Sequence, residues 1–188
     1  MKLTLIIQTL SVIYKVKMNK ATIRLSGYVN DSLVDGPGVR LAIFTQGCLY
    51  ACPGCHNPHT WDPSGGEEVA LDDLIAIWRK NPLLDGITLS GGEPLYQKEK
   101  LLPLIKAAVA DGLNVVMYTG STYEALVAKE DPVINEIFTY VDYLIDGPFV
   151  LMKKNLKLLY RGSENQRIIA LKKSTKDQLV LVEKMNEF

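Results

Sequence analysis

Strand-like and helix-like segments alternate along most of this 188-residue chain, and this order constrains its fold more than any other feature. The segments that favour strands are rich in β-branched and apolar residues, and they are residues 21–29, 39–45, 87–90, 114–119 and 140–146. The spacing of apolar residues predicts helices over 70–80, with Leu71, Leu74, Ile75 and Trp78 on one face, and over 97–110. A strand-then-helix order predicts an α/β fold built on a parallel sheet or a partial barrel.

Four unusual segments each follow one of these predicted strands. They are the cysteine-rich loop after residue 45, SGGEP (90–94), YTG (118–120) and DGPF (146–149). Because the carboxyl ends of parallel strands share one rim, we expect the four segments to meet at one mouth. A further helix is expected to begin at Ser121, since Glu124 completes a capping-box pattern.

Composition indicates an ordinary folded domain. Hydrophobic residues make up 47% and charged residues 22% of the chain, which excludes a disordered polypeptide. Lys plus Arg equals Asp plus Glu at 21 each, which argues against nucleic acid or an anionic membrane as a partner. We expect residues 1–20 to be an extension and residues 21–188 to form a single domain. The apolar run near the start is too short to span a bilayer.

All three cysteines of the chain, Cys48, Cys52 and Cys55, lie in one short stretch with C-x3-C-x2-C spacing. An odd, clustered set of cysteines does not suit a disulfide framework and points to a reducing cytoplasm. Three thiolates can hold a 4Fe–4S cluster and leave one iron open to an external ligand. A structural zinc site remains an alternative, with His59 as a feasible fourth ligand.

The SGGEP segment is the second candidate site. Gly91 and Gly92 expose backbone groups to a ligand, and the Glu93 carboxylate can accept hydrogen bonds from an ammonium group. Taken alone, a Gly-Gly turn before a proline is more often a plain connection between elements. Its predicted position beside the cysteine loop favours a binding role for this segment.

These motifs resemble a known superfamily. The C-x3-C-x2-C spacing followed by GGEP is similar to the radical S-adenosylmethionine enzymes. Together with them, VDGPGVR (34–40), YLIDGPF (143–149) and RGSENQR (161–167) resemble the glycyl-radical enzyme activators of anaerobic ribonucleoside-triphosphate reductase. The resemblance runs from about residue 26 to residue 169. It implies an open, partial β/α barrel with its active site at the carboxyl ends of parallel strands.

The resemblance also implies a chemistry. Cys48, Cys52 and Cys55 would hold one 4Fe–4S cluster whose open iron chelates S-adenosylmethionine. An electron from a donor such as flavodoxin would cleave that molecule to a 5′-deoxyadenosyl radical, which takes hydrogen from a glycine of the reductase. No side chain need act as acid or base. By the same resemblance, the residues that contact S-adenosylmethionine are Gly54, Cys55, His56, Gly91, Gly92 and Glu93.

Some positions depart from the superfamily pattern or stay unassigned. Gly54 stands where many relatives carry an aromatic residue. The adenine of S-adenosylmethionine would therefore be contacted by the backbone or by His56. Arg40 is either a solvated charge at a strand end or part of the site, and RGSENQR is either a surface loop or a contact segment. Two alternative functions remain: an activating enzyme of pyruvate formate-lyase, and a zinc-stabilised interaction module.

Overall fold

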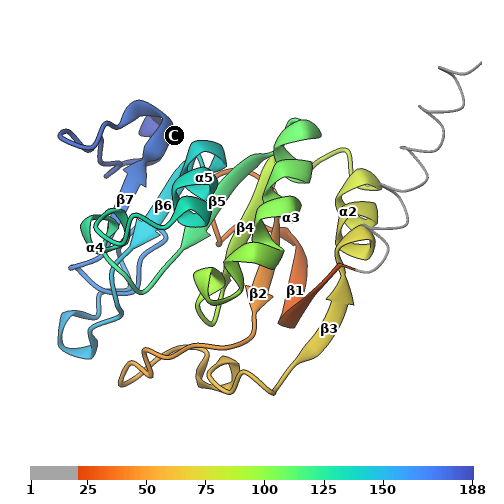
Figure 1. Ribbon diagram of the computed structural model, residues 1–188. Coiled ribbons are helices and arrows are strands. Elements are labelled where there is room, and N and C mark those ends of the chain that lie inside the picture. Colours follow the sequence, from red (N-terminus) through yellow and green to blue (C-terminus); the bar gives the residue numbers. More distant parts are fainter. Residues whose placement is uncertain (1–20) are drawn as a thin grey trace, which may run out of the picture.

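The computed structural model describes residues 21–188, and the predictions for residues 1–20 lie outside this described part. A seven-stranded mixed sheet runs through it in the order β3-β1-β2-β4-β5-β6-β7 (Figure 1). The strands are β1 (Thr22–Ser32), β2 (Arg40–Thr45), β3 (Glu67–Ala70), β4 (Gly86–Gly91), β5 (Asn114–Tyr118), β6 (Tyr143–Asp146) and β7 (Arg167–Ala170).

The centre of the sheet is parallel and its edges are antiparallel. β2 pairs with β4, β4 with β5, and β5 with β6, all in parallel. β1 is antiparallel to both β2 and β3, and β7 is antiparallel to β6. The predicted parallel α/β sheet is therefore confirmed for the four central strands, which are the strands that precede the four unusual segments. Residues 33–39 join β1 directly to β2, a connection that antiparallel neighbours allow without a crossover helix.

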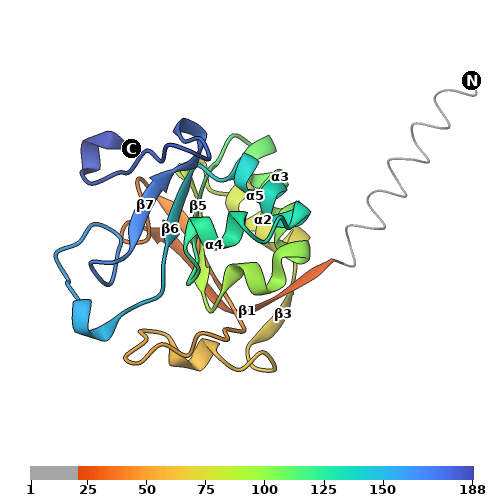
Figure 2. The ribbon, with the colours of Figure 1, turned by 60° about the vertical axis from the view of Figure 1, so that its left-hand side comes forward.

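Helices cover one face of the sheet. α2 (Leu71–Arg79), α3 (Lys98–Ala110) and α5 (Pro132–Tyr140) lie on that face, as the turned view shows (Figure 2). The short helix α4 (Tyr123–Val127) follows β5. The 3-10 turns are Pro58–Thr60, Pro94–Gln97, Leu151–Lys153, Leu171–Lys173 and Met185–Glu187. No helix in residues 21–188 is long and apolar enough to cross a membrane.

The hydrophobic core lies between the sheet and these helices. Leu41, Ile87 and Val115 form one row across neighbouring strands, and all three are fully buried. The predicted inner face of α2 is confirmed, because Leu71, Leu74, Ile75 and Trp78 are all buried. Burying one such side chain contributes about 1.5–3 kcal/mol, so this layer supplies most of the apolar burial in the fold.

Two local predictions are wrong. The helix after β5 is capped by Thr122 and not by Ser121: the Thr122 side chain accepts a 3.4 Å hydrogen bond from the amide of Ala125. The strand expected over 140–146 begins only at Tyr143, because Tyr140 ends α5. No helix was expected over 132–140.

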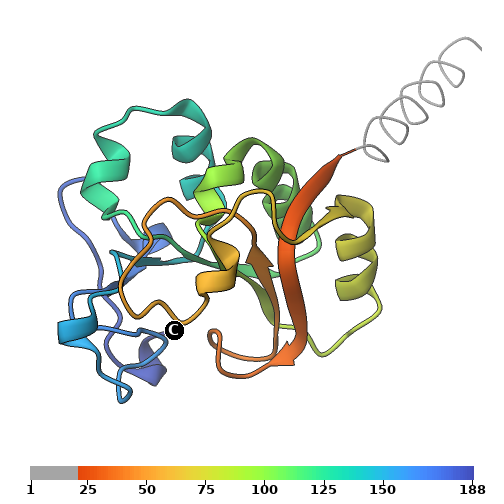
Figure 3. The ribbon, with the colours of Figure 1, turned by 90° about the horizontal axis from the view of Figure 1, so that it is seen from below.

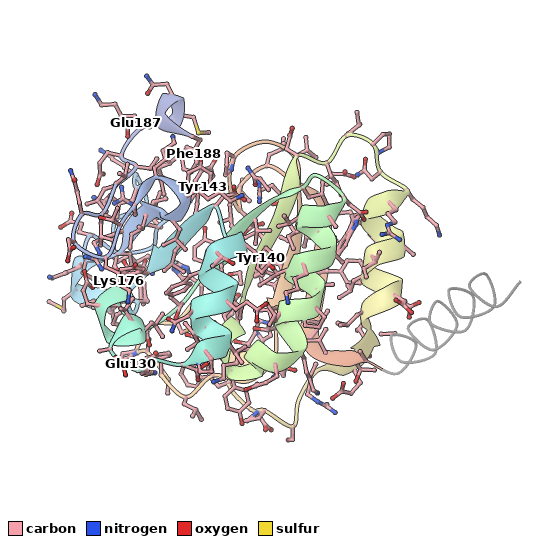
Figure 4. The ribbon with its side chains drawn as sticks, turned by 45° about the horizontal axis from the view of Figure 1, so that its top comes forward. Glu130, Tyr140, Tyr143, Lys176, Glu187 and Phe188 are labelled. Carbon is pink, nitrogen blue, oxygen red and sulfur yellow. The ribbon has the colours of Figure 1, made fainter. Side chains whose placement is uncertain are left out.

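The C-terminal segment covers part of the opposite face of the sheet. The amide of Val182 donates to the Ile168 carbonyl at 2.9 Å, so the segment runs along the outer edge of β7. The Phe188 ring lies 4.8 Å from the ring of Tyr143 and 5.7 Å from that of Tyr160 (Figure 4). The remainder of that face is open and forms the floor of a pocket.

Candidate functional site

A pocket of about 610 Å³ lies at the carboxyl ends of the four parallel strands. Its lining contains residues from the cysteine loop, from the turn after β4, from the turn after β5 and from the turn after β6. The prediction that these four segments meet at one mouth is therefore confirmed. Figure 3 shows the cysteine loop curling across this end of the molecule, beside the segment that follows β6.

The cysteine loop is held closed by its own backbone. The amide of Gly47 donates to the Thr60 carbonyl at 2.8 Å, and the amide of Cys48 donates to the Trp61 carbonyl at 3.1 Å. The Gln46 side chain donates to the carbonyls of His59 and Asp62 at 3.0 and 2.7 Å. These bonds join the two ends of the loop, so the three thiols are presented on a closed turn.

All three cysteines are free thiols, and all three are partly buried in the pocket wall. Burial raises the pKa of the Cys48 thiol, while hydrogen bonds from the backbone amides of Tyr50 and Ala51 act in the opposite direction. The Cys55 sulfur accepts a 3.4 Å hydrogen bond from the amide of Asn57. Amide donors of this kind suit sulfurs that carry negative charge.

The donor set fits a cluster better than a single ion. Within residues 21–188, no three or more His, Cys, Asp or Glu side chains gather closely enough to hold one metal ion. A single zinc needs its ligands to converge within about 2.0–2.3 Å of one point. His59, the proposed fourth zinc ligand, is exposed and does not line the pocket. Three partly buried thiols on one pocket wall suit a 4Fe–4S cluster, in which each cysteine binds a different iron.

Gly91 and Gly92 both line the pocket, and close backbone packing accounts for both glycines. A Cβ on Gly91 would meet the Thr45 amide nitrogen at 2.5 Å, and one on Gly92 would meet the Gly47 carbonyl oxygen at 2.4 Å. The amide of Gly92 donates to the Thr45 carbonyl at 2.8 Å. The paired glycines let the turn after β4 pack directly against the start of the cysteine loop.

Glu93 connects three loops of the pocket. Its backbone amide donates to the Gly47 carbonyl at 2.8 Å. One carboxylate oxygen accepts from the Leu95 amide at 3.1 Å, and the other accepts from the Gly120 amide at 2.8 Å and the Thr119 hydroxyl at 3.1 Å. Burial raises its pKa, and these hydrogen bonds partly offset the rise. A carboxylate has about four acceptor sites, so one remains for a ligand.

Tyr50 is a pocket residue that the sequence did not reveal. Its ring lies against Gly120, where a Cβ would come within 2.6 Å of the ring, and its hydroxyl bonds that of Ser121. Tyr50 therefore fastens the cysteine loop to the turn after β5. Ser121 makes this contact in place of the helix cap predicted for it. An aromatic residue between two cysteines gives no sequence pattern that would identify this role.

His56 and Gly54 face the segment that follows β6. The His56 ring lies 5.1 Å from the Phe149 ring, and a Cβ on Gly54 would meet the Leu151 side chain at 2.8 Å. His56 lines the pocket, whereas Gly54 does not. Phe149 was part of a predicted segment, but its packing on His56 was not foreseen.

Arg40 is fully buried, so its interpretation as a solvated charge at a strand end is wrong. Its guanidinium donates to the Thr88 hydroxyl at 2.6 Å and to the Pro37 carbonyl at 2.8 Å. Burial lowers its pKa to about 10. These bonds hold the 34–38 turn over the sheet, where Asp35 lines the pocket.

Comparisons with known proteins agree with the site. Residues 34–169 match the family model described as a 4Fe–4S single cluster domain. The chain is 34% identical to the anaerobic ribonucleoside-triphosphate reductase-activating protein of Enterobacteria phage T4, over 72% of this chain and 86% of that one. The corresponding protein of Escherichia coli K12 is also 34% identical, over 74% and 93%.

Two further matches cover less of the chain. The pyruvate formate-lyase-activating enzyme of Clostridium pasteurianum is 36% identical, over 61% of this chain and 52% of that protein. The solved structure of QueE from Escherichia coli matches 56% of each chain at 20% identity, with a TM-score of 0.47. The identity to the activating proteins extends over most of both chains, and the family-model match includes the cysteine loop. This chain belongs to the family of anaerobic ribonucleoside-triphosphate reductase-activating proteins.

Proposed function

We propose that this protein generates the glycyl radical of an anaerobic ribonucleoside-triphosphate reductase. One observation carries the proposal: three free cysteines on one closed loop line the same pocket as a Gly-Gly-Glu turn. The protein's membership of the activating-protein family supports the same function. The chain would be an oxidoreductase whose substrate is another protein.

Cys48, Cys52 and Cys55 are the residues that would hold a 4Fe–4S cluster, since they are the described thiols of the pocket wall. When bound, the cluster supplies an electron that cleaves S-adenosylmethionine to methionine and a 5′-deoxyadenosyl radical, which takes hydrogen from a glycine of the reductase. Three cysteine ligands would leave one iron open to S-adenosylmethionine.

The chain's own residues bind and orient. Glu93 keeps one acceptor site for the methionine amino group, beside the backbone of Gly91 and Gly92. Cys55 and His56, which line the pocket, and the neighbouring Gly54, which does not, are proposed to lie along the adenosine. These residues would contribute to the rate by holding the reacting groups close together. None of them needs to transfer a proton.

The proposed architecture is a radical S-adenosylmethionine domain over residues 21–188, with the sheet as an open, partial barrel. The mixed sheet, with helices on one face and the pocket on the other, supports this proposal. An open barrel leaves room for a loop of a large protein partner to reach the pocket. We propose the cytoplasm as the compartment and a flavodoxin-type protein as the electron donor.

Anaerobic reconstitution with iron and sulfide tests the proposal. The expected product is a brown, air-sensitive protein that forms 5′-deoxyadenosine from S-adenosylmethionine once reduced. A colourless protein that binds one tight zinc and cleaves nothing would contradict it. To separate the two activator classes, the protein is offered the reductase and pyruvate formate-lyase in turn, and glycyl radical is measured by electron paramagnetic resonance. We expect the signal in the reductase.

A further inference from the structure

The connection between β6 and β7 carries a local excess of positive charge. Residues 147–163 contain no Asp or Glu, and their basic residues are Lys153, Lys154, Lys157 and Arg161. Basic and acidic residues are equal in number over the whole chain, so this excess belongs to the segment. Arg161 pairs with Glu183, whereas the three lysines are exposed and form no ion pair within residues 21–188. Their charge is therefore available to a partner.

Large apolar side chains of the same segment are also exposed. Met152 is 93% exposed, Leu156 79% and Leu151 49%. Leu156 also lines the pocket, so it lies at the pocket rim. Leu151 lies against the cysteine loop, since a Cβ on Gly54 would come within 2.8 Å of its side chain. We call these exposed residues the rim patch, and its members are Leu151, Met152, Lys153, Lys154, Leu156 and Lys157.

The backbone of the rim patch is held in place by hydrogen bonds. Leu151–Lys153 form a 3-10 turn. The amide of Glu164 donates to the Lys153 carbonyl at 2.9 Å, and the amide of Asn155 donates to the Gly162 carbonyl at 3.1 Å. Figure 2 shows this segment, in light blue, projecting on the side of the sheet away from α2, α3 and α5. A fixed backbone reduces the entropy that a binding partner must remove.

The rim patch suits a protein partner better than a small molecule. Met152, Lys153 and Lys157 do not line the pocket, so a ligand that fits inside the pocket would leave them uncovered. Neighbouring exposed apolar side chains rimmed by charge are typical of protein–protein contacts. The charge of this patch is positive, and electrostatic complementarity favours an acidic surface on the partner.

We propose that the rim patch binds an acidic surface of the reductase while the reductase glycine enters the pocket. The inference rests on the proposed function, which supplies the partner. Met152 and Leu156 would pack against apolar side chains of the reductase, and the lysines of the patch would face its carboxylates. The patch thereby selects the protein that receives the radical, and it takes no part in the cleavage of S-adenosylmethionine.

Charge reversal tests the basic part of the rim patch. The double variant Lys153→Glu/Lys157→Glu is compared with Lys80→Glu/Lys176→Glu, which changes the net charge equally. Lys80 and Lys176 are exposed, form no ion pair within residues 21–188 and do not line the pocket. Equilibrium binding of the reductase to the anaerobically reconstituted protein is measured at low and at high salt. Cleavage of S-adenosylmethionine with a chemical reductant is measured without the reductase.

The rim-patch double variant should bind the reductase about 10-fold more weakly or worse at low salt. The difference from the wild type should shrink at high salt, because salt screens exposed charges. Cleavage of S-adenosylmethionine without the reductase should stay within about twofold of the wild type, as should both properties of the control.

Met152→Ser tests the apolar part of the patch. We expect this variant to bind the reductase about 3- to 10-fold more weakly, with unchanged cleavage of S-adenosylmethionine. The matched control is Leu83→Ser, because Leu83 is 73% exposed and does not line the pocket. It should bind the reductase as the wild type does.

Three results would overturn the inference. In the first, both rim-patch variants bind the reductase normally. In the second, each control weakens binding as much as its partner variant. In the third, the rim-patch variants bind the reductase normally but lose cleavage when a flavodoxin replaces the chemical reductant, which would assign the patch to the electron donor. A wild type that cleaves no S-adenosylmethionine, or gives the reductase no glycyl radical, would instead overturn the proposed function.

Discussion

The two faces of the sheet differ in what their side chains contact. The helix-covered face is aliphatic and complete: its residues, such as Leu104 and Ile87, are fully buried against one another. The opposite face carries free thiols, glycine turns and a buried arginine nitrogen without a partner. Outside the smaller apolar cluster under the C-terminal segment, which includes Val116 and Ile168, stability depends mainly on the helix-covered face and chemistry on the pocket. Substitutions of pocket side chains should therefore remove function with little effect on folding, and substitutions on the helix-covered face should destabilise the fold with little direct effect on the site.

Single replacement of Cys48, Cys52 or Cys55 by Ala should have the largest effect on function. Iron bound per chain should fall sharply, and 5′-deoxyadenosine formation should drop by more than about 100-fold. Because the thiols are only partly buried, the free energy of unfolding of the metal-free chain should change by no more than about 0.5 kcal/mol. Iron analysis and urea unfolding measure the two quantities. A variant that retains full cleavage would remove that cysteine from the ligand set.

Leu104→Ala tests the covered face. Leu104 lies in α3 and is fully buried, so the cavity should lower the free energy of unfolding by about 2–5 kcal/mol. Iron bound per folded chain should stay at the wild-type value. Urea unfolding together with iron analysis of the folded fraction checks both. Selective loss of iron from a fully folded variant would break the division between the faces.

Gly92→Ala lies at the boundary, where the pocket meets the sheet. The added methyl group would come within 2.4 Å of the Gly47 carbonyl oxygen. We expect the free energy of unfolding to fall by about 1–3 kcal/mol through overpacking. Iron binding should also weaken, since Gly47 precedes Cys48. The matched control is Gly112→Ala, because Gly112 has open space around it; its φ of 82° strains the backbone, but iron binding should be unaffected.

Glu124→Gln should have the smallest effect. Its carboxylate binds the Arg167 guanidinium, and this contact lowers the pKa of Glu124 below its ordinary value of 4.5. A lowered pKa means that the stabilisation is present above pH 4.5 and is lost as the pH falls through the lowered value. The pair is largely exposed, so at pH 7 the variant should be less stable by about 0.5 kcal/mol or less. Urea unfolding at several pH values should show this gap closing in acid; a gap that widens there would contradict the assignment.

Much of the fold was predictable because its signals are local. The α2 face follows from helical spacing, and the four buried strands follow from short apolar runs that end at polar or glycine turns. The convergence of the cysteine loop with SGGEP follows from strand direction alone. β3 and β7 were missed for local reasons: β3 is EEVA, which shows no clear alternation, and β7 is RIIA, a short apolar run directly after the polar residues 161–166.

The remaining features depend on tertiary contacts. Ser121 has the sequence pattern of a helix cap, yet its hydroxyl bonds Tyr50 from a distant loop. The position of Arg40 at a strand end is typical of a surface charge, yet its side chain is buried under the 34–38 turn. Within RGSENQR, Arg161 lines the pocket, whereas Arg167 forms ion pairs with Glu124 and Asp146. The backbone before Arg161 has a positive φ at Tyr160, which no local sequence pattern predicts. In each case the partner lies far away in the chain or the contact requires the finished sheet.

Transfer of hydrogen from the reductase tests the central claim most directly. The reduced, reconstituted protein is incubated with S-adenosylmethionine and with reductase whose glycine residues carry deuterium at Cα. The account predicts one deuterium in the 5′-deoxyadenosine, together with a glycyl radical signal from the reductase in electron paramagnetic resonance. The same mixture made with Cys52→Ala should give neither. 5′-Deoxyadenosine that forms without deuterium and without a glycyl radical in the reductase would contradict the account.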